Sequence, residues 1–300
     1  MPELPDVVLY VRSLDRLLTG KYLKTVTVRS PFVLRTFDPP IEAIEDRIVT
    51  GFSRRGKRIV WELEGPLFIV FHLMIAGRFH WRKTQTTNRG KHDLAAFGFD
   101  EGTMLLTEVS SKKRAAMWCV ATKSAVDALD PGGVDVLRAD DHVLREALLR
   151  SNNTLKRALA DPRRFDGIGN AYSDEILHAA KLSPLKRTAQ LDDSEISRLC
   201  IAMRATLQAW IDRLETQNAG QFPERVTAFR PEMSVHGRFA EACPDCGAPV
   251  QRIRYAENEC NYCPRCQTAG RILADRSLSR LLRDDWPRSL DDLDDPNRGK

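Results

Sequence analysis

The chain has 300 residues and a net charge of +5 at pH 7, with 42% hydrophobic and 29% charged residues. No apolar run approaches the roughly 18 to 20 residues of a membrane helix, and the start lacks a secretory signal pattern, so we expect a two-domain cytoplasmic protein without a membrane partner. Six aspartates against three basic side chains give residues 284–300 a net charge of −3, which leaves +8 on residues 1–283 and favours a polyanionic partner.

The first predicted element is an amphipathic helix over residues 5–19, which Gly20 terminates. Its apolar positions at helical spacing are Val7, Val11, Leu14 and Leu18. Short segments rich in β-branched and aromatic residues follow, such as KTVTVRS, RIVWELE, LFIVFHL, GRFHWR and GTMLLTEV. Turn residues separate them, and this pattern predicts an antiparallel, sandwich-like β domain that ends near residue 125.

The second half of the chain changes to helical periodicity. Segments such as DHVLREALLR and NAYSDEILHAAKL predict a mostly α-helical domain, and the Pro-Gly pair after residue 130 marks a linker. We expect the acidic end of the chain to be disordered. The predicted boundaries are 1–125 for the β domain, 126–139 for the linker, 140–234 for the helical domain, 235–270 for a zinc finger and 271–300 for a C-terminal extension.

Five of the seven cysteines fall within residues 243–266, which favours a metal site over disulfides in a cytosolic protein. Two C-x2-C pairs, CPDC and CPRC, stand sixteen residues apart and predict one structural zinc ion held by four thiolates. The predicted ligands are Cys243, Cys246, Cys263 and Cys266. Cys260 lies outside the repeated Cys-Pro-x-Cys pattern, and Cys119 and Cys200 stand among apolar residues as core positions.

The opening MPELPDV contains residues that a helix start does not explain. Pro5 and Asp6 suit the first turn of a helix and its dipole, but Pro2 and Glu3 precede it. Removal of Met1 exposes a secondary amine on Pro2, and an amine can act as a nucleophile at a sugar carbon. The adjacent Glu3 can donate and accept the protons that such a reaction needs.

The opening, the segment GIGNAYSDEIL and the terminal cysteine hairpin together resemble the Fpg/Nei family of DNA glycosylases, and are closer to its Fpg branch. The resemblance implies an α+β fold: an N-terminal β-sandwich with a leading α-helix, and a C-terminal helix-two-turns-helix domain with a zinc β-hairpin. It implies a monomeric base-excision-repair enzyme that removes a damaged base and cleaves the abasic site through a Schiff base. The implied partner is damaged DNA, duplex or single-stranded, at the bacterial nucleoid.

The same resemblance implies roles for individual residues. The catalytic residues are Pro2, Glu3 and Lys57. The DNA-binding residues are His72, Ile75, His92, Arg114, Lys156 and Asn170. In the segment DGIGN, glycines let backbone amides approach a phosphate at a helix N-terminus.

Several positions depart from the family pattern. Ala115 stands where the family has a wedge phenylalanine, Ile75 where it has methionine, and Asn258 where it has an arginine at the finger tip. The segment that covers a flipped purine is reduced to about AFRPEMS, residues 228–234. The residues that form the imine are therefore retained, whereas those that recognise the lesion are not.

Two further observations concern arginines. Arg252 and Arg254 alternate on one predicted strand of the hairpin, where they offer a substitute for the missing finger charge. The segment DPRRF at residues 161–165 spells a loop sequence of the family, but it stands in the helical half of the chain, and we interpret it as a coincidence.

Two alternatives stay open at this stage. One is a Nei-like enzyme for oxidised pyrimidines, single strands or unusual lesions. The other is a non-catalytic DNA-binding zinc protein. The departures favour strong cleavage of abasic sites and poor excision of 8-oxoguanine from duplex DNA, while the preferred lesion, the opposite base and the role of residues 267–300 remain open.

Overall fold

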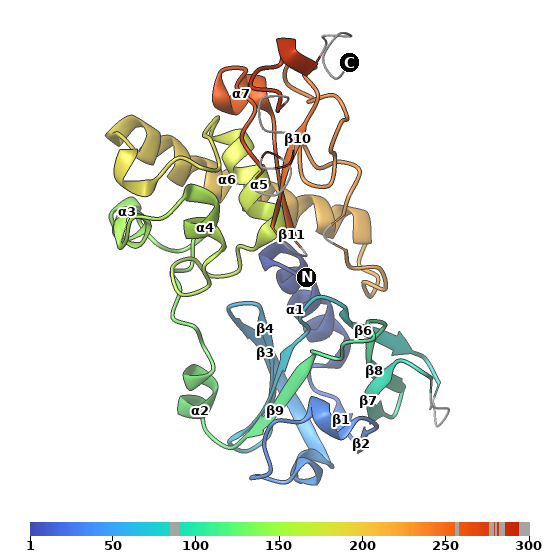
Figure 1. The fold of residues 1–300 in the computed structure, drawn as a ribbon. Helices are drawn as coiled ribbons and strands as arrows, with labels where there is room; N and C mark the ends of the chain where they lie inside the picture. The colour runs from blue at the N-terminus through green and yellow to red at the C-terminus, as the bar shows by residue number, and fades with distance from the viewer. Residues whose placement is uncertain are drawn as a thin grey trace. The chain divides into compact units, whose positions relative to one another are not determined.

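The computed structural model describes residues 1–84, 90–227, 229–255, 258–275, 279, 281 and 286–293. The chain forms two compact units (Figure 1). We call Met1–Gly132 with Ala209–Ala228 the N-terminal unit, and Gly133–Gln208 with Phe229–Lys300 the C-terminal unit. The acidic end that we expected to be disordered lies, over residues 294–300, outside the described residues.

The N-terminal unit begins with helix α1 (Leu4–Leu18) and continues as two antiparallel sheets. One sheet has the order β1-β3-β4-β5-β9 and the other β2-β7-β8-β6. The strands are β1 (Tyr22–Leu23), β2 (Thr25–Val28), β3 (Arg47–Arg55), β4 (Arg58–Leu63), β5 (Leu67–His72), β6 (Gly77–Arg82), β7 (Asp93–Phe99), β8 (Gly102–Glu108) and β9 (Ala116–Val120). The predicted sandwich with a leading helix is confirmed.

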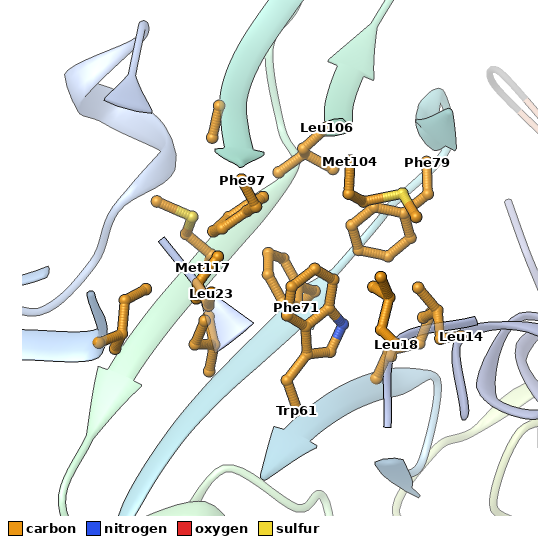
Figure 2. Packing of buried hydrophobic residues seen from close by; sticks show 14 of the residues in the cluster. Leu14, Leu18, Leu23, Trp61, Phe71, Phe79, Phe97, Met104, Leu106 and Met117 are labelled. Atoms are coloured by element: carbon orange, nitrogen blue, oxygen red, sulfur yellow. The ribbon is translucent and has the colours of Figure 1, made fainter. Parts of the chain in front are cut away.

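Aromatic side chains from both sheets fill the core of this unit, as Figure 2 shows. Trp61 lies in the centre, with the rings of Phe71 and Phe97 each 5.1 Å from it between centroids. Leu14 and Leu18 of α1 reach the same cluster. Burial of each such side chain contributes about 1.5 to 3 kcal/mol, so the core fixes α1, and with it the start of the chain, against the sandwich.

Short helices complete the N-terminal unit: η1 (Pro31–Val33), η2 (Ile41–Ile44) and α2 (Lys123–Ala128). Thr122 caps α2 by accepting a hydrogen bond from the backbone N–H of Ala125. The predicted linker of residues 126–139 therefore begins inside a helix, and the structural division falls at Gly132 instead.

The remaining elements lie in the C-terminal unit, except for the last part of α6. They are α3 (Asp141–Leu149), α4 (Leu155–Ala160), α5 (Asn170–Ala179), η3 (Thr188–Gln190), α6 (Asp193–Asn218), β10 (Gln251–Tyr255), β11 (Asn258–Tyr262), α7 (Pro264–Thr268) and η5 (Asp291–Leu293). The last part of α6, from Ala209, groups with the N-terminal unit, which differs from the predicted helical domain of 140–234. Within the described ranges, none of the helices has the length and apolar character to span a membrane.

Candidate functional site

The register of the strands brings most of the predicted residues of the N-terminal unit to one edge of the sandwich, by which we mean the end where β5 and β8 finish and β4, β6 and β9 begin. His72 ends β5 opposite Arg58 in β4 and Ala116 in β9, and Gly77 begins β6 opposite Glu108 at the end of β8. The turn between β5 and β6 and the loop between β8 and β9 therefore cross between the two sheets side by side. This edge carries Lys57, His72, Ile75, His92 and Arg114.

The start of the chain contributes Pro2 and Glu3, which are both buried. The backbone N–H of Glu3 donates to the Asp6 carboxylate at 3.0 Å, which ties the residue before α1 to its first turn. Burial lowers the pKa of the Met1 amino group from its ordinary value of 8.0, and the charges of Glu3, Arg78, Asp6 and Lys57 also act on it. An amine placed here is unprotonated, and so nucleophilic, at a lower pH than one in water.

Lys57 occupies the two-residue turn between β3 and β4, directly before Arg58. Burial, aided by the charges of Arg58 and Lys57, lowers the pKa of His72 to about 4. His72 is therefore neutral at physiological pH and can accept or donate a hydrogen bond without carrying charge. Lys57 thus lies close enough to influence both His72 and the amine at the chain start.

The turn from Leu73 to Gly77 presents Ile75, whose side chain is 53% exposed. Gly77 donates its N–H to the carbonyl of Leu73 at 2.8 Å, and a Cβ on Gly77 would lie 2.3 Å from that oxygen, so only glycine fits. Arg78 donates to the carbonyls of Ile75 (3.1 Å) and Val226 (2.6 Å). Arg78 therefore fixes the turn that exposes Ile75, a role that the sequence analysis missed.

The neighbouring loop is held by Glu108, which is 1% exposed. Its carboxylate accepts the backbone N–H of Arg114 at 2.9 Å and that of Ala115 at 3.1 Å. The Arg114 side chain is exposed, as a DNA contact requires, whereas Ala115 is 3% exposed and belongs to the apolar core. The exposed apolar side chain of this loop is instead Val109, at 68%.

His92 precedes β7 at the same edge, and its carbonyl accepts the N–H of Glu108 at 2.9 Å. The predicted residues of the N-terminal unit thus converge, although they come from five separate parts of the sequence. The groups gathered here are a buried amine, an acid, a lysine, a neutral histidine and an exposed arginine. The positive charges suit a polyanionic ligand, and the buried amine suits a nucleophile.

In the C-terminal unit, α5 begins at Asn170 after a glycine-rich turn in which Gly167 takes a positive φ of 79°. The first N–H groups of a helix have no partner within it and can bind a phosphate. The Asn170 side chain donates to the carbonyl of Glu259 in β11 at 2.9 Å. Lys156 in α4 donates to the Asn170 carbonyl at 2.5 Å and to Asp174 at 2.7 Å, so this lysine orders the start of α5.

Asp174 and Glu175 in α5 join this helix to the segment that leads into the hairpin. Asp174 is fully buried at its side chain and, besides Lys156, contacts the His236 ring at 2.8 Å and accepts the N–H of Asn261 at 3.1 Å. Glu175 accepts three successive backbone N–H groups, those of residues 234–236, at 2.8 to 2.9 Å. Sequence reasoning missed this network, although the acidic pair inside a predicted helix was its signal.

The four predicted metal ligands come together. The Sγ atoms of Cys243, Cys246, Cys263 and Cys266 all lie within 4.8 Å of one another. Two of these separations are 4.0 Å (Cys243 to Cys266) and 3.4 Å (Cys246 to Cys263), near the roughly 3.8 Å between thiolates of a tetrahedral zinc site. His178 of α5 also reaches Cys243, with Nε2 at 3.3 Å from Sγ. The cluster therefore fits a metal ion.

The remaining cysteines and the DPRRF segment have structural roles in the protein interior. Cys260 packs away from the cluster, against Ile253 and Tyr262. Burial raises the pKa of Cys119 to about 11, as expected for an inert core thiol. Arg164 of the DPRRF segment is buried and donates to the carbonyls of Leu148 and Ser151, which supports the interpretation of that segment as a coincidence.

The chain is similar to known proteins over most of its length. Residues 1–114 match the family model of the formamidopyrimidine-DNA glycosylase N-terminal domain, and residues 133–219 match that of the formamidopyrimidine-DNA glycosylase H2TH domain. A formamidopyrimidine-DNA glycosylase of Geobacter metallireducens is 33% identical, with 89% of this chain and 100% of the relative covered. An uncharacterized formamidopyrimidine-DNA glycosylase-like protein of Mycobacterium tuberculosis is 38% identical over 52% of this chain and 95% of its own length.

Solved structures of the Lactococcus lactis formamidopyrimidine-DNA glycosylase are also similar. Its non-covalent complex with DNA that contains an abasic site has a TM-score of 0.77 at 27% identity and covers 89% of this chain and 99% of that chain. Its complex with DNA that contains Fapy-dG has a TM-score of 0.79, again at 27% identity. The sandwich edge, the start of α5 and the four-cysteine hairpin thus define a DNA-repair glycosylase of the helix-two-turns-helix class. The chain belongs to the formamidopyrimidine-DNA glycosylase family.

Proposed function

We propose that this protein excises damaged bases from DNA and then cleaves the resulting abasic site, with the amine of Pro2 as its nucleophile. The observation that carries the proposal is the convergence, at one edge of the sandwich, of the buried chain start with Glu3, Lys57 and Arg78. Family membership supports the same activity. The protein acts in the cytoplasm at the nucleoid, because its proposed substrate is chromosomal DNA and its relatives are bacterial. We also propose that it acts as a monomer.

The chemistry follows from these groups. After loss of Met1, the Pro2 nitrogen attacks C1′ of the damaged nucleotide, and the base leaves with a proton that Glu3 supplies. Glu3, now a carboxylate, takes the Pro2 N–H proton and passes it to the ring oxygen O4′ as the C1′–O4′ bond breaks and an iminium ion with Pro2 forms. The iminium acidifies the C2′ hydrogen, which the Glu3 carboxylate removes as the bond to the 3′ phosphate breaks. Lys57 attracts a neighbouring phosphate and carries protons, while water finally hydrolyses the iminium and frees the amine.

The C-terminal unit grips the DNA backbone. The N-terminus of α5 at Asn170 binds a phosphate, and Lys156 adds positive charge and orders that helix start. Cys243, Cys246, Cys263 and Cys266 hold one zinc ion, which supplies folding stability to the hairpin and takes no part in the reaction. The His178 contact to Cys243 supports this assignment, since metal thiolates accept hydrogen bonds from neighbouring side chains.

The preferred substrates are abasic sites and lesions in unpaired or weakly paired DNA. Flipping a nucleotide out of a duplex costs a few kcal/mol, and wedge side chains offset this cost. Ala115 is buried, so the apolar side chain that this loop exposes is Val109, near Arg114, with Ile75 from the neighbouring turn. Poor excision of 8-oxoguanine opposite cytosine follows from the same argument. The burial of Ala115 therefore favours one feature of the Nei-like alternative, which is activity on unpaired DNA.

Single-turnover cleavage of matched oligonucleotides tests the proposal. Abasic, 8-oxoguanine and oxidised-pyrimidine substrates are compared, each in single and double strands. Glu3→Gln should slow base excision by roughly 10² or more, because proton transfer contributes about that much. The matched control is Glu64→Gln, an exposed glutamate in the turn at the opposite end of β4, which should retain the wild-type rate. A wild-type chain that binds but cleaves none of these substrates points instead to a non-catalytic DNA-binding protein.

A further inference from the structure

Residues after the cysteine cluster pack onto the hairpin formed by β10 and β11. The N–H of Leu273 donates to the Tyr262 hydroxyl at 2.7 Å, and the Leu273 side chain joins Ile253, Cys260 and Tyr262 in one apolar cluster. The Lactococcus enzyme is matched over 99 to 100% of its length while covering only 89% of this chain. The chain therefore contains segments beyond the common fold, and the described part of its C-terminal extension is ordered against the hairpin.

Further contacts tie this extension back to the cysteine cluster. The N–H of Ile272 donates to the Arg288 carbonyl at 2.9 Å, and the N–H of Leu290 donates to the Gly270 carbonyl at 3.0 Å. Leu290 also packs against the apolar residues around the four cysteines. Residues 270–273 are thus held from both sides, by the hairpin and by residues 288–290.

Among the described residues of the extension, Asp275 contacts the outer edge of β10. Asp275 is 1% exposed, and its carboxylate accepts the backbone N–H of Arg254 at 2.7 Å. In the register of the hairpin, Arg254 lies opposite Glu259, next to the pair Tyr255 and Asn258 that closes the ladder. A hydrogen bond from a backbone N–H to a carboxylate is stronger than a neutral one. Asp275 therefore fixes the backbone of β10 one residue before its end.

The two arginines of β10 differ in what holds their side chains. The Arg252 guanidinium lies 4.0 Å from the centre of the Phe239 ring and 3.5 Å from the Glu259 carboxylate. The Arg254 side chain is exposed, and the described parts of the chain contain no ion pair to it. Arg252 is thus used within the C-terminal unit, while Arg254 is presented to solvent near the end of the hairpin.

We propose that Arg254 binds a DNA phosphate and that the C-terminal extension, through Asp275, is the device that positions it. This proposal rests on the proposed function, since it adds a phosphate contact to that DNA complex. Arginine suits this role because its guanidinium forms paired hydrogen bonds with phosphate oxygens. Asp275 is a positioning residue: it contacts the backbone of Arg254 and holds the strand from which the guanidinium extends.

The test measures equilibrium binding of the zinc-loaded full chain to a duplex with a tetrahydrofuran abasic analogue, over a range of salt concentrations. Each lost phosphate contact reduces the slope of log K against log salt by about 0.9. Arg254→Ala should lower that slope by about this amount and weaken binding about three- to tenfold at low salt. Asp275→Ala should do the same in part, and Asp275→Asn, which keeps an acceptor oxygen, should retain most of the affinity.

Three comparisons separate positioning from general damage. The double variant Arg254→Ala with Asp275→Ala should bind no more weakly than Arg254→Ala alone, because both changes remove one contact. Zinc content should stay at the wild-type level, and the control Arg271→Ala, an exposed arginine of the extension, should leave the slope unchanged.

Additive effects of the two substitutions, a wild-type slope for Asp275→Ala, or loss of zinc in that variant would overturn the proposal. A wild-type protein that binds the duplex but fails to cleave abasic DNA would instead contradict the proposed function and leave the Arg254 contact standing. The two failures are therefore distinguishable within one set of samples.

Discussion

Replacement of Asp174 by alanine should destabilise the C-terminal unit strongly. The Asp174 side chain is fully buried, and it is the anionic partner of Lys156, whose side chain is only 12% exposed. Removal of one partner from a buried ion pair costs about 3 to 5 kcal/mol, because the other charge stays in a poorly solvated place. The same substitution also strips an acceptor from His236 and from the N–H of Asn261.

The magnitude can be followed by calorimetry. For a unit of this size, each kcal/mol lowers the melting temperature by about 2 to 4 °C, so the transition of the C-terminal unit should fall by roughly 6 to 20 °C. Asp193→Ala, the control, removes an exposed aspartate that pairs with Arg145 on the surface of the same unit, and it should cost less than about 1 kcal/mol. Lys156→Met together with Asp174→Asn should recover part of the loss. A shift below 2 °C for Asp174→Ala would refute the argument from uncompensated charge.

Other predictions concern the metal, the nucleophile and the wedge. Cys246→Ala should reduce zinc content by atomic absorption, whereas Cys260→Ala should keep one zinc per chain, and the reverse result would exchange these two residues in the ligand set. Burial lowers the pKa of the Met1 amino group, and the same surroundings should lower the pKa of the Pro2 amine once Met1 is removed. Single-turnover cleavage should therefore rise with pH, with a midpoint below the pKa of the Pro2 amine in a short peptide, and be constant at higher pH. An equal or higher midpoint would count against a buried nucleophile. Ile75→Ala should slow cleavage of duplex abasic DNA about tenfold while sparing single strands, because only the duplex needs a wedge, and equal losses on both would exclude that role.

The features that could be predicted from the sequence are those that depend on patterns of neighbouring residues. The spacing of the two C-x2-C pairs predicted the four-cysteine cluster, and β-branched segments separated by turns predicted the sandwich. The opening motif predicted catalytic roles for Pro2 and Glu3, and the structure shows that both residues are buried. The charges of Lys57 and Arg78 act on the amino group of the preceding Met1. Each of these inferences depends on residues that are close together in the sequence.

What the sequence did not reveal depends on long-range register. Glu108 accepts the N–H of Arg114 and so holds its loop. Glu108 lies at this place because it ends β8 opposite Gly77 of β6, a pairing between residues about thirty positions apart. The partners of Asp174 come from α4, from β11 and from His236. Two adjacent acids in a predicted helix signal a buried charge, but no local pattern identifies these partners. The burial of Ala115 likewise results from the packing of both sheets. Its match to the family's wedge position in the sequence does not predict that the residue is buried.

The central claim is that the amine of Pro2 forms the covalent bond to DNA. The most direct measurement is borohydride reduction of the protein mixed with abasic DNA, followed by protease digestion and mass spectrometry of the peptide that carries the nucleotide. We predict a mature chain that starts at Pro2 and a single modified site on its amine, and no adduct in protein that retains an N-terminal tag. An adduct on Lys57 or another lysine, or full trapping by the tagged protein, would contradict it.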